Sequence, residues 1–122
     1  MDSELLEELR MIEGSTEMDR LGFLINQINE MKGWNTINRS EGDWASLAHS
    51  EISEAFKSFR NNEKLVWFNE DGKPEGAAIE YADAMIRILH WFNRRGINPM
   101  YAIATKIRYN ISRPQFHGGK AM

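Results

Sequence analysis

The chain contains no cysteine, which excludes disulfide frameworks, thiolate metal sites and cysteine nucleophiles. No apolar run approaches the roughly 20 residues that a membrane-spanning helix needs. The acidic start MDSELLEELR is also unlike the basic start of a secretory signal. From these absences we expect a cytoplasmic protein that spans no membrane.

A strong excess of one charge is also missing, since 15 Lys and Arg residues stand against 18 Asp and Glu residues, for a net charge of -3. Binding to a nucleic-acid polymer or to an anionic membrane requires clustered basic residues, so we expect neither partner. Strand signals are scarce as well. Only KLVWF, residues 64–68, could form a strand, and the sequence offers it no pairing partner.

Apolar residues at helical spacing are what the sequence has in abundance. They occupy residues 3–14, 15–33, 43–60, 74–95 and 98–112. Asp43 can cap the third of these segments, and the fourth is expected to begin at Pro74 or Glu75. Residues 1–122 are therefore predicted to form a single all-α domain, a bundle of four to five helices. Segment 74–95 is apolar over most of its circumference, so we expect oligomerisation to complete the bundle.

Segments 43–60 and 74–95 each carry two carboxylates three residues apart, Glu51 with Glu54 and Glu80 with Asp83. At 100° per residue, Glu51 falls inside the apolar arc of its helix and Glu54 at the edge of that arc. Ionised carboxylates that meet in a partly dry place require a counter-charge. A hard divalent cation fits an all-oxygen set, with Mg²⁺ as the first choice and Mn²⁺ as its substitute.

A simpler interpretation stays open, because acidic pairs at this spacing are common on solvated helix faces. The acids could also be neutralised by nearby basic side chains, namely Lys57, Arg60, Arg87 and His90.

The C-terminal stretch KIRYNISRPQFHGGK, residues 106–120, gathers basic, amide and glycine residues. Lys106, Asn110 and Arg113 share one helical face, and Tyr109 lies beside it. His117 and Lys120 bracket two glycines, which let backbone N–H groups approach an anion. This stretch is either a solvated basic tail or a phosphate-binding segment. Together with four acids it suggests a metal-bound polyphosphate.

The motifs SEISEA and EYADAMIRIL resemble the E-x-x-E and E-x-x-D signature of the all-α nucleoside triphosphate pyrophosphatases, the MazG-like superfamily. The KPEG lead-in and the N-x-x-R-P-x-x-H-G-G-K tail are similar too, so that the resemblance covers most of residues 44–120. It implies Mg²⁺-dependent hydrolysis of a nucleoside triphosphate, by preference a deoxynucleoside triphosphate, between the α and β phosphates. It also implies a homodimer or a homotetramer.

The same resemblance assigns roles to individual residues. The metal ligands and catalytic acids would be Glu51, Glu54, Glu80 and Asp83. Residues 113–122 would form a nucleotide-binding tail. Phosphate contacts would come from Lys106, Asn110, Arg113 and Lys120, and Tyr109 and His117 would line the nucleotide site. Trp34 would stack on the base and Asn26 would read a base edge.

Three alternatives remain open at this point. Two of them stay inside the superfamily, as a phosphoribosyl-ATP pyrophosphohydrolase or a relative of the dimeric dUTPases, which share the acidic motifs. The third is a non-catalytic helical interaction module whose acids form a solvated surface. The sequence leaves the preferred base undecided.

Overall fold

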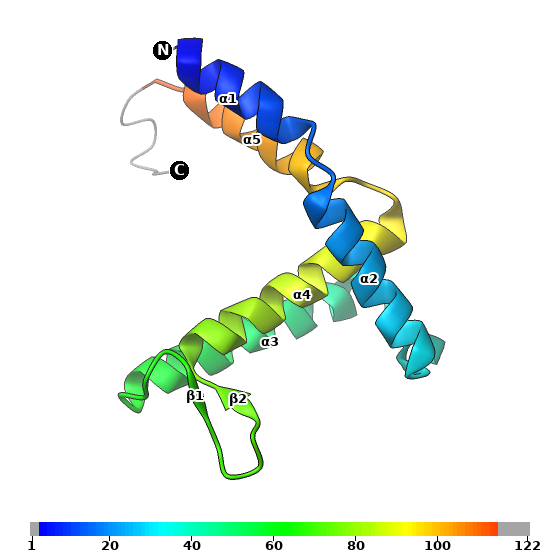
Figure 1. Ribbon diagram of the computed structural model, residues 1–122, viewed down its shortest axis with the longest axis vertical. Helices are drawn as coiled ribbons and strands as arrows, with labels where there is room; N and C mark the ends of the chain where they lie inside the picture. The colour runs from blue at the N-terminus through cyan, green and yellow to red at the C-terminus, as the bar shows by residue number, and fades with distance from the viewer. Residues whose placement is uncertain (1–2, 115–122) are drawn as a thin grey trace.

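The computed structural model describes residues 3–114, which are mostly helical, as predicted (Figure 1). Only one short pair of strands interrupts the helices in this part of the chain. The elements in chain order are α1 (Ser3–Glu13), α2 (Glu17–Met31), the 3₁₀-helix η1 (Trp34–Thr36), α3 (Glu41–Arg60), β1 (Trp67–Phe68), β2 (Pro74–Glu75), α4 (Ala77–Arg95) and α5 (Pro99–Ser112).

The helices are arranged as two arms that meet at an elbow (Figure 1). Helices α1 and α5 pack side by side in one arm, and α3 and α4 pack side by side in the other. Helix α2 crosses α4 at the elbow, where Asn98 Nδ2 donates a hydrogen bond to the carbonyl of Ser15 at 3.3 Å. A single chain therefore does not close a bundle around one core.

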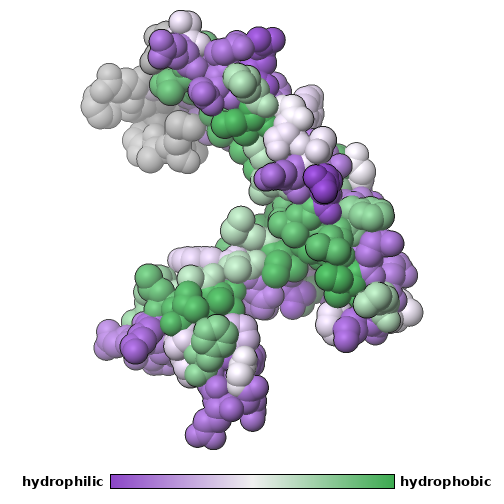
Figure 2. Space-filling model, in the orientation of Figure 1, coloured by the Kyte–Doolittle hydropathy of each residue, from purple (hydrophilic) through white to green (hydrophobic). Residues whose placement is uncertain are grey.

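Small residues form the seam between α3 and α4. Ala48, Ala55 and Ala84 are buried along it, and Ala55 has no exposed surface. Larger apolar side chains beside the seam stay exposed, among them Phe56 and Met85. Figure 2 shows apolar surface over the crossing of α2 with α4 and along the α3–α4 arm. Apolar faces are thus left uncovered within one chain.

The accessible surface of the chain measures this openness. It amounts to 9218 Å², whereas a compact monomer of 14.2 kDa would expose about 6,800 Å². The chain exposes roughly a third more surface than a closed monomer of its mass.

The crossing of α2 with α4 depends on Gly22. A Cβ at this position would lie 2.9 Å from the carbonyl oxygen of Leu89 on α4. Contacts this short do not occur in well-packed proteins, so the two helix backbones approach as closely as they do because residue 22 is a glycine.

Two predictions about the region before α4 were wrong. KLVWF does find a partner, because Trp67 pairs with Glu75 and Phe68 with Pro74 in an antiparallel ladder. Helix α4 consequently begins at Ala77 and not at Pro74 or Glu75. The reason is Gly76, whose φ of 110° breaks the helix and whose backbone lies so close to the Leu65 carbonyl that no Cβ would fit.

The start of α3 also differs from the prediction. Ser40 is the N-cap, and the helix begins at Glu41. Asp43 instead occupies the third helical position of a capping box: its backbone N–H donates to Ser40 Oγ at 3.1 Å, and its Oδ2 accepts from the Ser40 N–H at 3.0 Å. This reciprocal pair fixes the entry of the helix that carries Glu51.

None of the helices within residues 3–114 has both the length and the apolar character that crossing a membrane would require.

Candidate metal centre and the adjoining cavity

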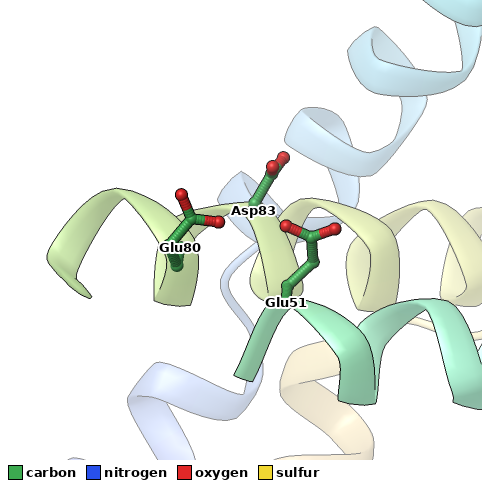
Figure 3. Close-up of side chains that lie close together, drawn as sticks. All are labelled: Glu51, Glu80 and Asp83. Atoms are coloured by element: carbon green, nitrogen blue, oxygen red, sulfur yellow. The ribbon is translucent and has the colours of Figure 1, made fainter. Parts of the chain in front are cut away.

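Three carboxylates converge between α3 and α4 (Figure 3). Glu51 extends from α3 towards Glu80 and Asp83 on α4, and one oxygen of each residue lies within 4.8 Å of the other two. Ala48 and Ala55 flank Glu51 on the same helix face, so the close seam that they form draws the Glu51 side chain up to α4. The side chain of Glu51 is 14% exposed.

The acid cluster (Glu51, Glu80 and Asp83) is short of positive charge. Burial raises the pKa of Glu51 above its ordinary value, and the hydrogen bond and charge repulsion from Asp83 raise it further. Arg87 Nε lies 3.5 Å from Glu51 Oε1 and lowers that pKa only in part. Within residues 3–114, one guanidinium is paired with the three carboxylates, an arrangement that favours an additional cation.

Glu54 is placed differently from the other three acids. It lies on α3 one turn after Glu51, is exposed, and is not part of the group whose oxygens lie within 4.8 Å of one another. The structure brings together three of the four acids that the sequence singled out. The role of Glu54 as a fourth ligand stays a prediction.

The expected phosphate contacts lie on the other arm. Lys106, Tyr109 and Asn110 belong to α5, which packs against α1 and α2, and Arg113 is its C-cap. Figure 1 shows α5 extending away from the α3–α4 arm. Among the described residues, Asn110 Oδ1 and Arg113 Nε are buried and find no hydrogen-bond partner. These residues therefore do not reach the acids of the same chain, while His117 and Lys120 lie outside the described residues.

A cavity of about 300 Å³ adjoins the acid cluster near the C-terminal end of α2. Asp83 and Arg87 belong to its wall, so the cavity and the cluster share a border. Trp34, predicted to stack on a base, also lines it. The complete lining is Asn29, Trp34, Asn35, Ile37, Arg39, Trp44, Asp83, Ile86, Arg87, His90 and Arg94.

Asn26 lies behind this wall as the centre of a hydrogen-bond network. Its Oδ1 accepts from Asn35 Nδ2 at 3.0 Å and lies 3.0 Å from His90 Nε2. Asn35 Nδ2 also donates to Glu30 Oε1 at 2.9 Å. The side-chain oxygen of Asn26 is thus already engaged, and its predicted contact with a base edge would use the amide nitrogen.

The electrostatics of the cavity differ from those of the acid cluster. Burial lowers the pKa of His90, and the charges of Arg94 and Arg39 lower it further, so the imidazole is neutral near pH 7. Arg94 pairs with Glu30 at 3.8 Å, and Arg39 lies over the ring of Trp44. The cavity therefore joins cationic and aromatic side chains on the border of an anionic cluster.

Sequence reasoning missed much of this wall. Asn29, Asn35 and Arg39 were not recognised, because their positions depend on how α2 and the turn after it pack against α4. One signal was present in the sequence: the polar stripe of α4 that holds Asp83 and Arg87 continues at helical spacing through His90 to Arg94.

No family model matches the chain, and neither a curated protein nor a solved structure was found to be similar to it. The MazG-like resemblance thus depends on the motifs of this sequence, and membership in the superfamily stays a hypothesis.

Proposed function

We propose that this protein hydrolyses nucleoside triphosphates, by preference deoxynucleoside triphosphates, between the α and β phosphates to release a monophosphate and pyrophosphate. The observation that carries the proposal is the convergence of Glu51, Glu80 and Asp83. These acids come from the two sequence motifs that resemble the pyrophosphatase signature, and the motifs meet across one helix pair.

The acid cluster fits a hard divalent cation such as Mg²⁺ or Mn²⁺. Its three carboxylates lie within 4.8 Å of one another, and burial and repulsion raise the pKa of Glu51, so Arg87 neutralises the ionised cluster only in part. When bound, the cation would hold phosphate oxygens at the cluster and withdraw electron density from phosphorus. Glu51, Glu80 and Asp83 would hold it, with the exposed Glu54 as a further carboxylate within the motif.

The side chains of this chain supply the rest of the chemistry. One of the four acids accepts the proton of the attacking water, for which a carboxylate with a raised pKa is suited. Arg87 lies between the cluster and the cavity, and its guanidinium can exchange Glu51 for a phosphate oxygen when substrate enters. Arg39 and Arg94 add positive charge on the same side.

A second copy of the chain completes the site in this proposal. The predicted phosphate contacts on α5 lie on the arm away from the acids, and in the described part of the chain Asn110 Oδ1 and Arg113 Nε have no hydrogen-bond partner. The surface in excess of a compact monomer is about 2,400 Å², which is within the range of obligate interfaces. A homodimer or homotetramer would cover this surface and bring α5 of one protomer towards the acids of another.

The test is pyrophosphate release from a panel of deoxynucleoside and ribonucleoside triphosphates with Mg²⁺, with phosphoribosyl-ATP included. We expect release that requires the cation. Asp83→Asn should reduce it by at least about 100-fold, with helical content unchanged by circular dichroism. Asp71→Asn, the same change at an exposed turn, is the matched control.

Glu54→Gln examines the fourth acid separately, and we expect the same loss of turnover. Near-normal activity in Asp83→Asn would contradict the metal assignment. If the intact oligomer released no pyrophosphate from any triphosphate, the enzyme proposal would fail. The exposed apolar faces would then favour the helical interaction module.

A further inference from the structure

The cavity beside the acid cluster has walls of a different chemistry from the cluster itself. Its volume of about 300 Å³ is at the lower end of the range of small-molecule sites. Trp34 and Trp44 offer flat apolar surfaces, and Asn29 and Asn35 offer amides. Flat aromatic walls combined with a few amides suit a planar, polar ligand such as a nucleobase.

The amide of Asn35 has a fixed orientation. Its Nδ2 donates to Glu30 Oε1 at 2.9 Å, and it also donates to Asn26, where the side-chain Oδ1 at 3.0 Å and the backbone carbonyl at 3.3 Å share the second hydrogen. A backbone carbonyl and an ionised carboxylate can only accept, so the nitrogen must point at them and the oxygen must lie at the other end. Asn35 Oδ1 has no hydrogen-bond partner within residues 3–114.

Asn29 is fixed in the same way. Its Nδ2 donates to the backbone carbonyl of Ile25 at 2.8 Å, which again can only accept. Its Oδ1 is left without a partner in the described part of the chain. Both amides on the cavity wall therefore have an acceptor, and not a donor, left for a ligand.

His90 adds a third acceptor. Asn26 Oδ1 accepts from Asn35 Nδ2, so the Asn26 atom that lies 3.0 Å from His90 Nε2 is an oxygen. His90 Nε2 must then carry the hydrogen. Because the ring is neutral, its Nδ1 is unprotonated and can only accept.

We propose that this cavity selects a nucleobase with an amino group at C4 of a pyrimidine or C6 of a purine, cytosine or adenine, over its oxo counterpart, uracil or hypoxanthine. An amino group can donate to the free oxygens of Asn29 and Asn35. A carbonyl in the same place would face those acceptors and leave both sides unpaired, which should weaken binding by at least about tenfold. Because the ligand is taken to be a nucleotide, the inference rests on the proposed function.

The test measures binding of deoxynucleoside monophosphates to the full chain in EDTA, so that no hydrolysis is required. The ligands form two pairs, dCMP with dUMP and dAMP with dIMP. The members of a pair differ in the amino or oxo group and in the hydrogen that the oxo form carries on the neighbouring ring nitrogen. Fluorescence of Trp34 and Trp44 reports occupancy, and calorimetry gives the affinities. We expect the amino member to bind at least about tenfold more tightly in one pair or both, and the pair that discriminates identifies the base as pyrimidine or purine.

Asn29→Ala should bring the ratio of affinities within a discriminating pair towards one, because it deletes one of the acceptors. Gln27→Ala is the matched control, since Gln27 is an exposed residue of the same helix that does not line the cavity. A folded Asn29→Ala protein that kept the full ratio would overturn the assignment of this residue.

Equal or reversed affinities in both pairs, or no binding of any of the four ligands, would overturn the inference even if no variant folded. Pyrophosphate release separates this failure from that of the proposed function. A chain that releases pyrophosphate equally from dCTP and dUTP retains the proposed function and loses the base preference. A chain that binds dCMP over dUMP but hydrolyses no triphosphate retains the base preference and loses the proposed function.

Discussion

Neutralising Glu51 should stabilise the metal-free protein and remove its response to Mg²⁺. Glu51→Gln keeps the size of the side chain and an oxygen that can accept from Arg87, but it removes one of the three clustered negative charges. Most substitutions of residues that are largely buried destabilise a protein, so a gain in stability here is a distinctive expectation.

The magnitude follows from the distances. Two unit charges 4.8 Å apart repel by about 0.9 kcal/mol in water and about 3.5 kcal/mol at an effective dielectric constant of about 20. Glu51 has two such neighbours. Its attraction to Arg87 at 3.5 Å is about 1.2 to 4.7 kcal/mol on the same scale. The summed repulsion exceeds the attraction both in water and at a dielectric constant of about 20. Because Asp83 is exposed, the energies in water are the closer guide, and we expect Glu51→Gln to raise the free energy of unfolding by about 1 kcal/mol.

The assay is thermal unfolding followed by circular dichroism at one protein concentration, with EDTA or with about 5 mM Mg²⁺. A gain of 1 kcal/mol corresponds to about 4 °C in Tm for a chain of this size. A cation site with a Kd of about 0.5 mM would add about 1.4 kcal/mol to the wild type. Mg²⁺ should add nothing to the stability of Glu51→Gln.

Glu70→Gln is the matched control, because Glu70 is an exposed residue of the β1–β2 turn and its substitution makes the same change in net charge. Its Tm should change little, and its Mg²⁺ response should equal that of the wild type. A lower Tm in Glu51→Gln than in this control would show that the pair with Arg87 outweighs the repulsion. An undiminished Mg²⁺ response would refute the metal site.

Two further predictions concern pH and packing. Since the pKa of Glu51 is raised in the folded chain, its stabilising contribution is present at low pH and is lost as the pH rises from the ordinary value of 4.5 through the raised one. The Tm advantage of Glu51→Gln should therefore vanish below about pH 4.5 and grow above it, and an advantage independent of pH would contradict this cause. Gly22→Ala should lower the free energy of unfolding in urea by about 1 to 3 kcal/mol, because its Cβ meets the Leu89 carbonyl at 2.9 Å. Gly42→Ala, whose Cβ meets nothing closer than 3.8 Å, should be neutral or stabilising, and equal effects of the two substitutions would refute the close approach.

Local patterns were sufficient to locate the helices and the acidic motifs. Segment 98–112 coincides with α5, where Asn98 is the N-cap and Pro99 the first helical residue, because capping depends on a few adjacent residues. The predicted start of α3 was wrong because two nearby residues are both suited to be its N-cap. Asp43 and Ser40 can both cap a helix, and only the reciprocal hydrogen bonds select Ser40.

The strand pair shows a different limit. Residues 67–68 pair with residues 74–75 because Gly76 adopts a backbone conformation that ends the ladder and starts α4 against the Leu65 carbonyl. A glycine permits that conformation but does not require it, so the sequence alone could not distinguish a strand from an early helix start.

The sequence by itself determined that the chain is mostly helical and that Glu51 lies on an apolar helix face, because both follow from the spacing of residues along one helix. Only the tertiary structure decided that Glu51, Glu80 and Asp83 meet while Glu54 stays exposed, and that α5 lies on the other arm. It also decided which amide atoms of Asn29 and Asn35 remain available. Distances between helices depend on the depth of the alanine seam and on the turns that join the helices, and no repeat within a single helix encodes them.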